Sequence, residues 1–562
     1  MLCPDREWND KFGEASERIA WYVYDWAQSV FGGVAIAFFI PLLLQAMADE
    51  HGGSKLGQCE GSCFPNNLTN CKMPPDSQSC RTCVVGKGYQ IVDAYGTEKE
   101  LRDLSGADYP KVDFFGQQTR STSFSLVVIS ISVICQALSF ITFGAIADYS
   151  NFRRLCLVIT IVVGCLASLA FIAVGDPSLY AVAAWLTIVS NTCFGLSIVF
   201  YNAYLPILVQ KHPEVKAAAP HRRQSVYDEI QNYMSTTAYM WGYLASVFYL
   251  IVCIVLSFVM PSDSRADQML YYRVTIFIGG VWWAGFSLWT IKYLKPHPGP
   301  QLPAGEWLLT KGWVSTGKTL MSASAFPQTI KFLVAYFIYS DSYTTVASVG
   351  VLLMNELLCM SNSMLGIVFI EVLAVAVFGN WLTLKVQQRF ALQAKHMIFG
   401  CLCCYILLSC LGLLGLIEGS PVGLKNVWEA FVFGFIHGLC IGSIQSFSRV
   451  MFSDLLIPGR EAEFFALYEI TDRGSSWLGP MVMAQVGAAT GEYRLGFAYL
   501  LVMLILPSLL LLTIDHEKGM KDVRAFADAQ KVHCVASEES SALRSGAAMS
   551  NAVMDSSARG GL

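Results

Sequence analysis

The chain has few charged residues for its length. Lys, Arg, Asp and Glu make up 14% of its 562 residues, whereas soluble domains carry about 25%. A hydrophobic fraction of 54% and a mean hydropathy of +0.47 accompany this deficit. These values exclude a soluble globular protein and a chain that is disordered over most of its length. The formal net charge of -4 provides no basic surface for nucleic acid.

Long apolar runs occupy most of the sequence. A membrane-spanning helix needs about 20 predominantly apolar residues, and we count twelve such segments. They lie near residues 19–47, 121–147, 155–174, 179–209, 230–260, 272–294, 328–354, 362–384, 397–417, 427–452, 464–486 and 495–515. The sequence therefore predicts an all-α integral membrane protein with twelve transmembrane helices in two six-helix halves. The first segment follows a polar stretch and contains Asp25 and Pro41, so we expect a retained span and not a cleaved signal peptide.

The spans divide the chain into five parts. We expect a cytosolic N-terminus over 1–18, a first half over 19–294, a cytosolic linker over 295–327, a second half over 328–515 and a disordered cytosolic tail over 516–562. Lys and Arg concentrate in the even-numbered short loops. Because basic short loops stay in the cytosol, both termini are predicted to be cytosolic.

The first odd-numbered loop, about residues 48–120, is rich in cysteine. It contains Cys59, Cys63, Cys71, Cys80 and Cys83, together with the glycosylation sequon at Asn67. Clustered cysteines beside a glycan acceptor indicate an oxidising, lumenal or extracellular face. A metal site is the alternative to disulfides, although no His lies between the cysteines. The fifth cysteine either stays free or pairs elsewhere.

One segment of the predicted linker imitates a phosphate-binding loop. Residues 312–319 (GWVSTGKT) match the pattern G-x-x-x-x-G-K-[ST]. That pattern binds phosphate only where it follows a strand and opens a helix in an α/β domain. A linker of this length between two spans has no room for such a sheet. We therefore expect an interfacial amphipathic element here and no ATP site.

The two sets of six spans share faint internal repeats. The first and seventh predicted helices match when Asp25 is aligned with Asp341, and the fourth and tenth bring Asn202 opposite Gln445. Both matches correspond to a shift of six helices. Parallel repeats of this kind are typical of secondary transporters built from two similar halves.

The segment GAIADYSNFRR follows the second predicted helix. It resembles the signature of the major facilitator superfamily, in which an apolar helix end with Gly and Asp precedes a basic pair. Asp148 would bridge to neighbouring helices, and Arg153 and Arg154 would hold the loop at the interface. The segment departs from the signature at Tyr149 and Asn151, and an ordinary basic turn is the alternative.

A narrower resemblance, to the vacuole effluxer family of that superfamily, covers about residues 15–515. It is carried by residues 21–27 (WYVYDWA), 335–341 (AYFIYSD), 445–449 (QSFSR), 459–468 (GREAEFFALY), 471–476 (TDRGSS) and 478–480 (LGP). The resemblance implies export of neutral amino acids, such as leucine, from a degradative vacuole or lysosome to the cytosol during autophagic recycling. The plasma membrane is the alternative location.

Polar and ionisable side chains within spans are costly, so they mark candidate substrate or proton pathways. They are Asp25, Gln28, Asn202, Asp341, Glu371, Gln445 and Arg449. Asp25 and Asp341 lead, because equivalent helices would bring both to one cavity, where either would carry a proton or attract an ammonium group. Arg449 is a candidate for a substrate carboxylate. The alternatives are structural partners for each aspartate and helix-to-helix hydrogen bonds for Asn202 and Gln445.

Other charged residues lie toward the predicted cytosolic ends of the helices. We expect a gate formed by Asp148, Arg153, Arg154, Glu461, Glu463, Glu469, Asp472 and Arg473. Glu371, in the eighth predicted helix, has no evident partner. A gate is favoured over a binding site for this set.

These features favour alternating-access transport, which needs no cofactor, no metal and no covalent chemistry. A polytopic enzyme is disfavoured because no nucleophile has a nearby base, and a scramblase is a further alternative. A carrier for a sugar, a nucleoside or a drug is the third interpretation. An amino acid and the lipid bilayer are the expected partners, with protons as a further candidate.

Overall fold

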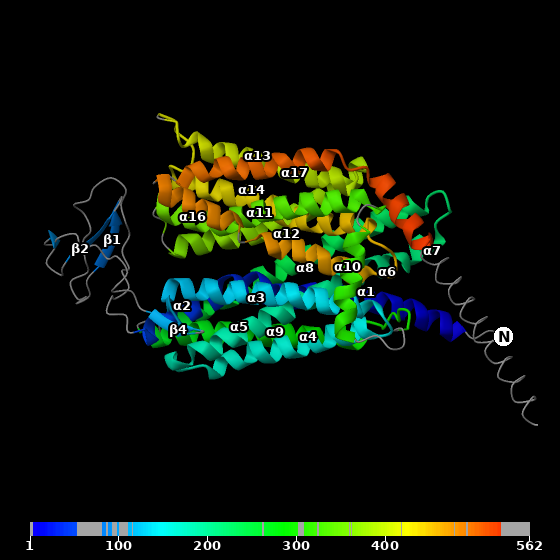
Figure 1. The fold of residues 1–562 in the computed structure, drawn as a ribbon, viewed down its shortest axis with the longest axis horizontal. Helices are drawn as coiled ribbons and strands as arrows, with labels where there is room; N and C mark the ends of the chain where they lie inside the picture. The colour runs from blue at the N-terminus through cyan, green and yellow to red at the C-terminus, as the bar shows by residue number, and fades with distance from the viewer. Residues whose placement is uncertain are drawn as a thin grey trace, which may run out of the picture.

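The computed structural model describes residues 4–52, 81–85, 88–92, 98–99, 111–114, 116–260, 264–301, 308–322, 325–358, 360, 362–417, 419–476, 478–490 and 493–529. These residues are almost entirely helical (Figure 1). Within this part of the chain, nine helices are long and apolar enough to cross a membrane, or ten if the bent pair Gly496–Leu512 and His516–Ala529 is one span. The chain is therefore a multi-pass membrane protein.

The helices up to residue 293 form what we call the first helix group. They are α1 (Pro4–Val30), η1 (Phe31–Phe39), α2 (Ile40–His51), α3 (Ser121–Gly144), η2 (Ile146–Asp148), α4 (Phe152–Ala170), η3 (Phe171–Ala173), η4 (Pro177–Leu179), α5 (Tyr180–Asn202), α6 (Leu205–Gln210), α7 (Pro213–Ala217), α8 (Arg223–Val259) and α9 (Arg265–Tyr293). α1 packs on α8 and α9, α4 packs on α5 and α9, and α3 packs on α5.

The second helix group begins after the linker helix α10 (Leu308–Met321). Its members are α11 (Pro327–Leu358), α12 (Asn362–Phe390), α13 (Ala394–Leu414), α14 (Val427–Asp454), α15 (Glu461–Ser475), α16 (Leu478–Thr490), η6 (Tyr493–Leu495) and α17 (Gly496–Leu512). α14 packs on α12 and α13, and α17 packs on α11 and α13. The groups meet where α8 contacts α12 and α14, and where α15 contacts α3 and α5.

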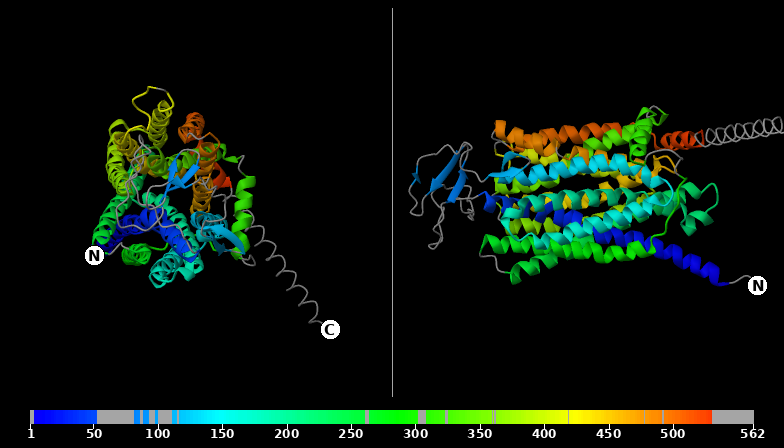
Figure 2. Two further views of the ribbon diagram at one scale, coloured as in Figure 1. Left: turned by 90° about the vertical axis from the view of Figure 1, so that its left-hand side faces the viewer. Right: turned by 60° about the horizontal axis from the view of Figure 1, so that its bottom comes forward.

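The two ends of the bundle differ. Two antiparallel sheets lie at one end, which we call the strand end (Figure 1). They are formed by β1 (Arg81–Val85), β2 (Gly88–Val92) and β3 (Glu98–Lys99), in that order, and by β4 (Lys111–Phe114) and β5 (Gln117–Arg120). α6, α7 and α10 lie at the other end, which we call the α10 end, and α1 begins on that side in Figure 2.

The first span is irregular at its centre, because the π-helix η1 separates α1 from α2. Gly32 lies in η1, where an added Cβ would come within 2.1 Å of the ring of Phe194 on α5. Only glycine permits this close approach. Short π-helical segments are frequent at functional sites, and this one lies beside the candidate site described below.

The prediction of a disordered tail is wrong for its first part, because residues His516–Ala529 form a helix. Val523 and Ala527 are buried, and Phe526 packs against Phe326, so this helix has an apolar face spaced by four residues. The Ser- and Ala-rich composition concealed this short amphipathic pattern. The rest of the tail lies outside the described residues.

Most residues named in the predictions for the cysteine-rich loop lie outside the described part of the chain. Asn67, Cys59, Cys63, Cys71 and Cys80 lie outside the described residues, and Cys83 is placed in β1 opposite Gln90 of β2. Glycosylation and disulfide formation therefore stay predictions.

The segment that imitates a phosphate-binding loop lies inside α10. Every strand that the structure describes precedes residue 121, so none of them leads into this segment. Gly312 rests against the backbone of Ile141 and Thr142 of α3. Its role is thus close packing of α10 on the bundle.

Candidate functional site between the helix groups

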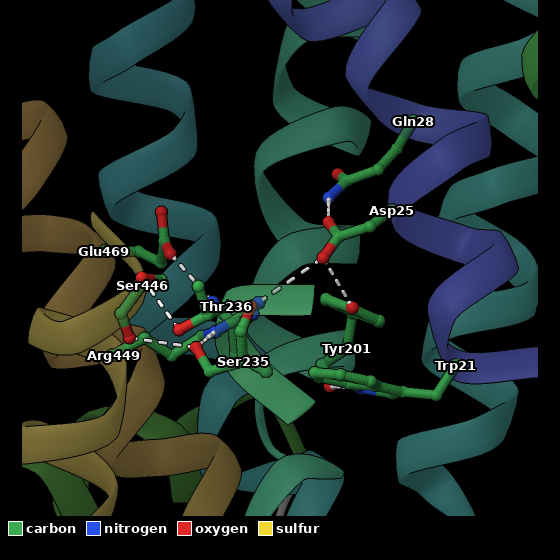
Figure 3. A network of polar contacts seen from close by, with 10 residues as sticks. Trp21, Asp25, Gln28, Tyr201, Ser235, Thr236, Ser446, Arg449 and Glu469 are labelled. Atoms are coloured by element: carbon green, nitrogen blue, oxygen red, sulfur yellow. Dashed lines mark hydrogen bonds and ion pairs between the residues drawn. The ribbon is translucent and has the colours of Figure 1, made fainter. Parts of the chain in front are cut away.

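A buried ion pair joins the two helix groups near the middle of the network shown in Figure 3. Asp25 of α1 and Arg449 of α14 are 3% and 1% exposed, and Nη1 of Arg449 lies 3.7 Å from Oδ2 of Asp25. The Tyr201 hydroxyl and the Gln28 amide each donate a hydrogen bond of 2.7 Å to the Asp25 carboxylate. Both oxygens of Asp25 are therefore engaged.

The Arg449 guanidinium also makes hydrogen bonds to the first helix group. Its Nε donates to Oγ of Ser235 at 3.0 Å, and its Nη2 donates to the Ser235 carbonyl at 2.9 Å. Its Nη1 donates to Oδ1 of Asn202 at 3.1 Å. These contacts reach α5 and α8 from α14, so Arg449 holds the two groups together.

Aromatic rings surround the same guanidinium. Its Cζ lies 4.4 Å from the ring centre of Tyr239, 5.1 Å from that of Trp21 and 5.8 Å from that of Tyr201. Such cation–π contacts stabilise a buried positive charge. The tyrosine and tryptophan rings were absent from the predicted site, although Tyr201 directly precedes the predicted Asn202.

The network continues from Arg449 into α15. Nδ2 of Asn202 donates to Oε1 of Glu469 at 3.2 Å. Oε2 of Glu469 lies 3.5 Å from Nε of Arg473, whose Cζ lies 5.4 Å from the ring centre of Phe194 on α5. Contacts thus run without a break from the Asp25 ion pair to Arg473.

A neighbouring set of polar contacts joins α8 to α14. The Tyr243 hydroxyl donates to Oε1 of Gln445 at 2.7 Å. Oγ of Ser235 donates to the Ser446 carbonyl at 2.9 Å. Gln445 therefore faces the first helix group, as does Arg449 four residues later.

Asp341 lies in a different environment from Asp25. Its carboxylate accepts hydrogen bonds from the Gly479 amide at 3.0 Å and from the Tyr499 hydroxyl at 3.2 Å, both within the second helix group. These contacts do not support the prediction that the two aspartates face one cavity. Tyr339 is one of the residues of α11 that contact α14, and its hydroxyl is 2.7 Å from Oγ of Ser448. A shift of two residues turns a helix by about 200°, so Asp341 points away from the side of α11 on which Tyr339 contacts α14.

Asp472 and Glu371 also lie within the second group. Oδ1 of Asp472 accepts hydrogen bonds from Tyr336 at 2.9 Å and from Tyr343 at 3.1 Å. Oε2 of Glu371 is buried beside Gly434 of α14 and has no hydrogen-bond partner among the described residues.

A second contact between the groups lies at the α10 end. The Asp148 carboxylate, at the end of η2, accepts hydrogen bonds of 2.9 Å from the amides of Ala462 and Glu463 in the first turn of α15. Nη2 of Arg153 is 2.7 Å from Oδ1 of Asp148 and 2.9 Å from Oε2 of Glu461. One helix group therefore caps a helix of the other, where free amides and the helix dipole favour a negative charge.

The linker helix joins this contact. Oγ1 of Thr319 and Oγ of Ser315 donate to the Glu463 carboxylate at 2.7 and 2.9 Å, and Arg460 pairs with the same carboxylate at 2.7 Å. Arg154 differs from the rest of the predicted gate, because its Nη2 donates to the Ile291 carbonyl at 2.8 Å and stays within the first group.

The helix His516–Ala529 connects both groups at the α10 end. Nη2 of Arg524 donates to Oε1 of Gln224 on α8 at 2.7 Å. Nε2 of His516 lies 3.1 Å from Oδ2 of Asp454 on α14. Burial lowers the pKa of His516, but the hydrogen bond and the negative charge of Asp454 outweigh burial and raise this pKa above its ordinary value.

Comparison with known sequences identifies one family. The model of the family described as "Vacuole effluxer Atg22 like" matches residues 14–524. Autophagy-related protein 22 of Coccidioides immitis is 29% identical over 91% of this chain and 89% of its own length. Autophagy-related protein 22-2 of Aspergillus fumigatus is 30% identical over 90% of this chain and 89% of its own.

Solved structures share the fold at low sequence identity. The proton:xylose symporter XylE of the major facilitator superfamily has a TM-score of 0.57 and 12% identity, with coverage of 91% of this chain and 99% of that one. The human organic anion transporter MFSD10 has a TM-score of 0.53 and 11% identity, with coverage of 89% and 99%. The helices are therefore arranged in the major facilitator fold.

Proposed function

This chain belongs to the Atg22-like vacuole effluxer family and is a membrane transporter, and from this premise we propose that it exports neutral amino acids, such as leucine, from a vacuole or lysosome to the cytosol. The buried polar network between the two helix groups is the observation that carries the proposal. Family membership supports the substrate class and the location.

The network acts as a closed gate on the cytosolic side. In this proposal the α10 end faces the cytosol, because it carries the short basic loops. The Asp148 contact and the Asp25–Arg449 pair both join the groups there or deeper in the bundle. Export requires these contacts to break while the strand end closes, which is the rocking motion of alternating access.

Twelve spans follow from the same proposal. To the nine helices that meet the length and hydropathy criteria and the span that contains α17, we add α11 and the broken pair α15–α16. The first and second helix groups are then the two six-helix halves. The α15–α16 break lies next to Gly479, which donates to Asp341.

Proton coupling has a physical route through Asp25. A proton on this carboxylate would remove the charge that faces Arg449. Because an unpaired buried charge is costly, protonation from an acidic lumen would loosen the pair and favour opening toward the cytosol. Substrate binding and protonation would then act on the same gate.

The test is counterflow of radiolabelled leucine in proteoliposomes of the purified chain. A panel of unlabelled amino acids, sugars, nucleosides and organic anions competes, with and without an imposed pH gradient. We expect neutral amino acids to compete and an acidic donor side to accelerate net flux. Competition by sugars or nucleosides alone would indicate that the chain transports another class of solute. The absence of counterflow for every solute would contradict transport by this chain.

A further inference from the structure

Two guanidinium groups lie where the helix groups meet, and they differ in what they can still bind. Arg449 is 1% exposed and donates to Ser235 and Asn202 beside its pairing with Asp25. The Arg473 side chain is 23% exposed, and its buried Nε lies 3.5 Å from Oε2 of Glu469 without a well-formed hydrogen bond among the described residues. Arg473 is therefore the more exposed of the two, and its single ion-pair contact with Glu469 is longer than the hydrogen bonds that hold Arg449.

Arg473 also lies at the depth expected of a substrate site. In the proposed orientation Glu461 lies at the cytosolic boundary, and a rise of about 1.5 Å per residue puts Arg473 about 18 Å deeper along α15, close to the middle of a hydrocarbon layer about 30 Å thick. Its guanidinium faces Phe194 of the opposite helix group. Transporters of this architecture bind their substrates near the midplane, between the two halves.

We propose that Arg473 binds the carboxylate of the transported amino acid, and that Glu469 and Asn202 transmit this binding to the Arg449–Asp25 pair. The proposal rests on the proposed function, since it assigns a binding residue for the same substrate class. A planar guanidinium with five donors matches a carboxylate in two parallel hydrogen bonds. Arg449 keeps the separate role of holding the gate.

The route of transmission consists of contacts already described. A substrate carboxylate would compete with Glu469, which now lies 3.5 Å from Arg473. Glu469 accepts a hydrogen bond from Asn202, and Oδ1 of Asn202 accepts one from Arg449. Displacement of Glu469 therefore perturbs the residue that positions Arg449 beside Asp25. If these polar contacts carry the coupling, a mutation that removes any one of them should weaken it.

The test compares leucine with leucinamide, which has the same side chain and ammonium group but no carboxylate. Both compete for radiolabelled leucine counterflow in proteoliposomes, and both are titrated against the melting temperature of the purified chain. We expect wild type to prefer leucine by about 10- to 100-fold, the range for hydrogen bonds to a charged group. Arg473→Gln should remove this preference by weakening leucine, while leucinamide changes by less than about 3-fold.

Two further variants make the outcome decisive. Arg473→Lys keeps the positive charge but loses the paired donors, so it should retain part of the preference for leucine. This variant also provides the test if Arg473→Gln does not fold. Arg389→Gln, an exposed arginine at the end of α12, should keep the wild-type preference. A wild-type chain that binds leucine and leucinamide equally, or an Arg473→Lys variant with an unchanged preference, would overturn the assignment.

The transmission step has its own readout. Asn202→Ala should still bind leucine in the melting assay, with a midpoint within about 3-fold of wild type, but should lose counterflow. Equal losses of binding and counterflow would contradict the route. A failure of the proposed function would give a different result, because the wild-type chain would then show no leucine counterflow.

Discussion

The Asp148 contact allows a quantitative test of the closed cytosolic end. Asp148 accepts two backbone hydrogen bonds from α15 and pairs with Arg153. Asp148→Asn keeps the shape, but its amide nitrogen cannot accept, so one N–H of α15 loses its partner. The charge facing the helix dipole is also lost. The loss of one charge-assisted hydrogen bond and of part of the helix-dipole interaction should weaken the contact between Asp148 and α15 by about 2–4 kcal/mol.

Hydrogen exchange measures this change where it occurs. The amides of Ala462 and Glu463 donate to Asp148, so their exchange reports opening of the contact. A loss of about 2–4 kcal/mol corresponds to exchange that is about 30- to 1,000-fold faster in Asp148→Asn. Asp176→Asn is the matched control, because Asp176 accepts from the Ser178 amide within one helix group. Equal exchange of α15 in both variants would refute the idea that Asp148 closes the gate.

Three further predictions concern other charged groups. Asp25→Asn leaves Arg449 without its buried counter-ion and should lower the stability of the purified chain by about 3–5 kcal/mol, as measured by denaturant unfolding. Asp341→Asn should retain gradient-driven accumulation and exchange in proteoliposomes, because its partners lie within the second group; loss of accumulation alone would make Asp341 a proton carrier. The pKa of His516 is raised when its helix is docked, so the ion pair with Asp454 contributes its full stabilisation below pH 6.5. This contribution is lost as the pH rises through the raised pKa. Limited proteolysis after residue 515 should therefore increase with pH, and His516→Gln should remove that dependence.

The sequence predicts the general architecture because membrane helices are long, apolar and separated by polar loops. The family resemblance was carried by short motifs and agrees with the family match. Asp148 was identified from such a motif, yet its acceptance of two α15 amides depends on how two distant helices pack. The amphipathic pattern of His516–Ala529 was too short to stand out from a tail of small residues.

The candidate site was harder to predict than the fold. Faint repeats aligned Asp25 with Asp341, whereas Asp25 pairs with a residue of the other helix group and Asp341 accepts hydrogen bonds from its own group. The difference between Arg449 and Arg473 is invisible in the sequence, since both are arginines near a helix end. It arises from burial and from partners on α5 and α8.

Alternating access through the α10 end is the central claim, and a distance across that end tests it most directly. Spin-labelled unnatural amino acids at Glu214 on α7 and Lys385 on α12, both exposed, leave the 18 cysteines untouched. Pulsed electron paramagnetic resonance in proteoliposomes should show one short distance without substrate. Leucine should add a longer distance, and Asp148→Asn should populate that longer distance without leucine. A single distance that stays unchanged while leucine counterflow proceeds would contradict the account.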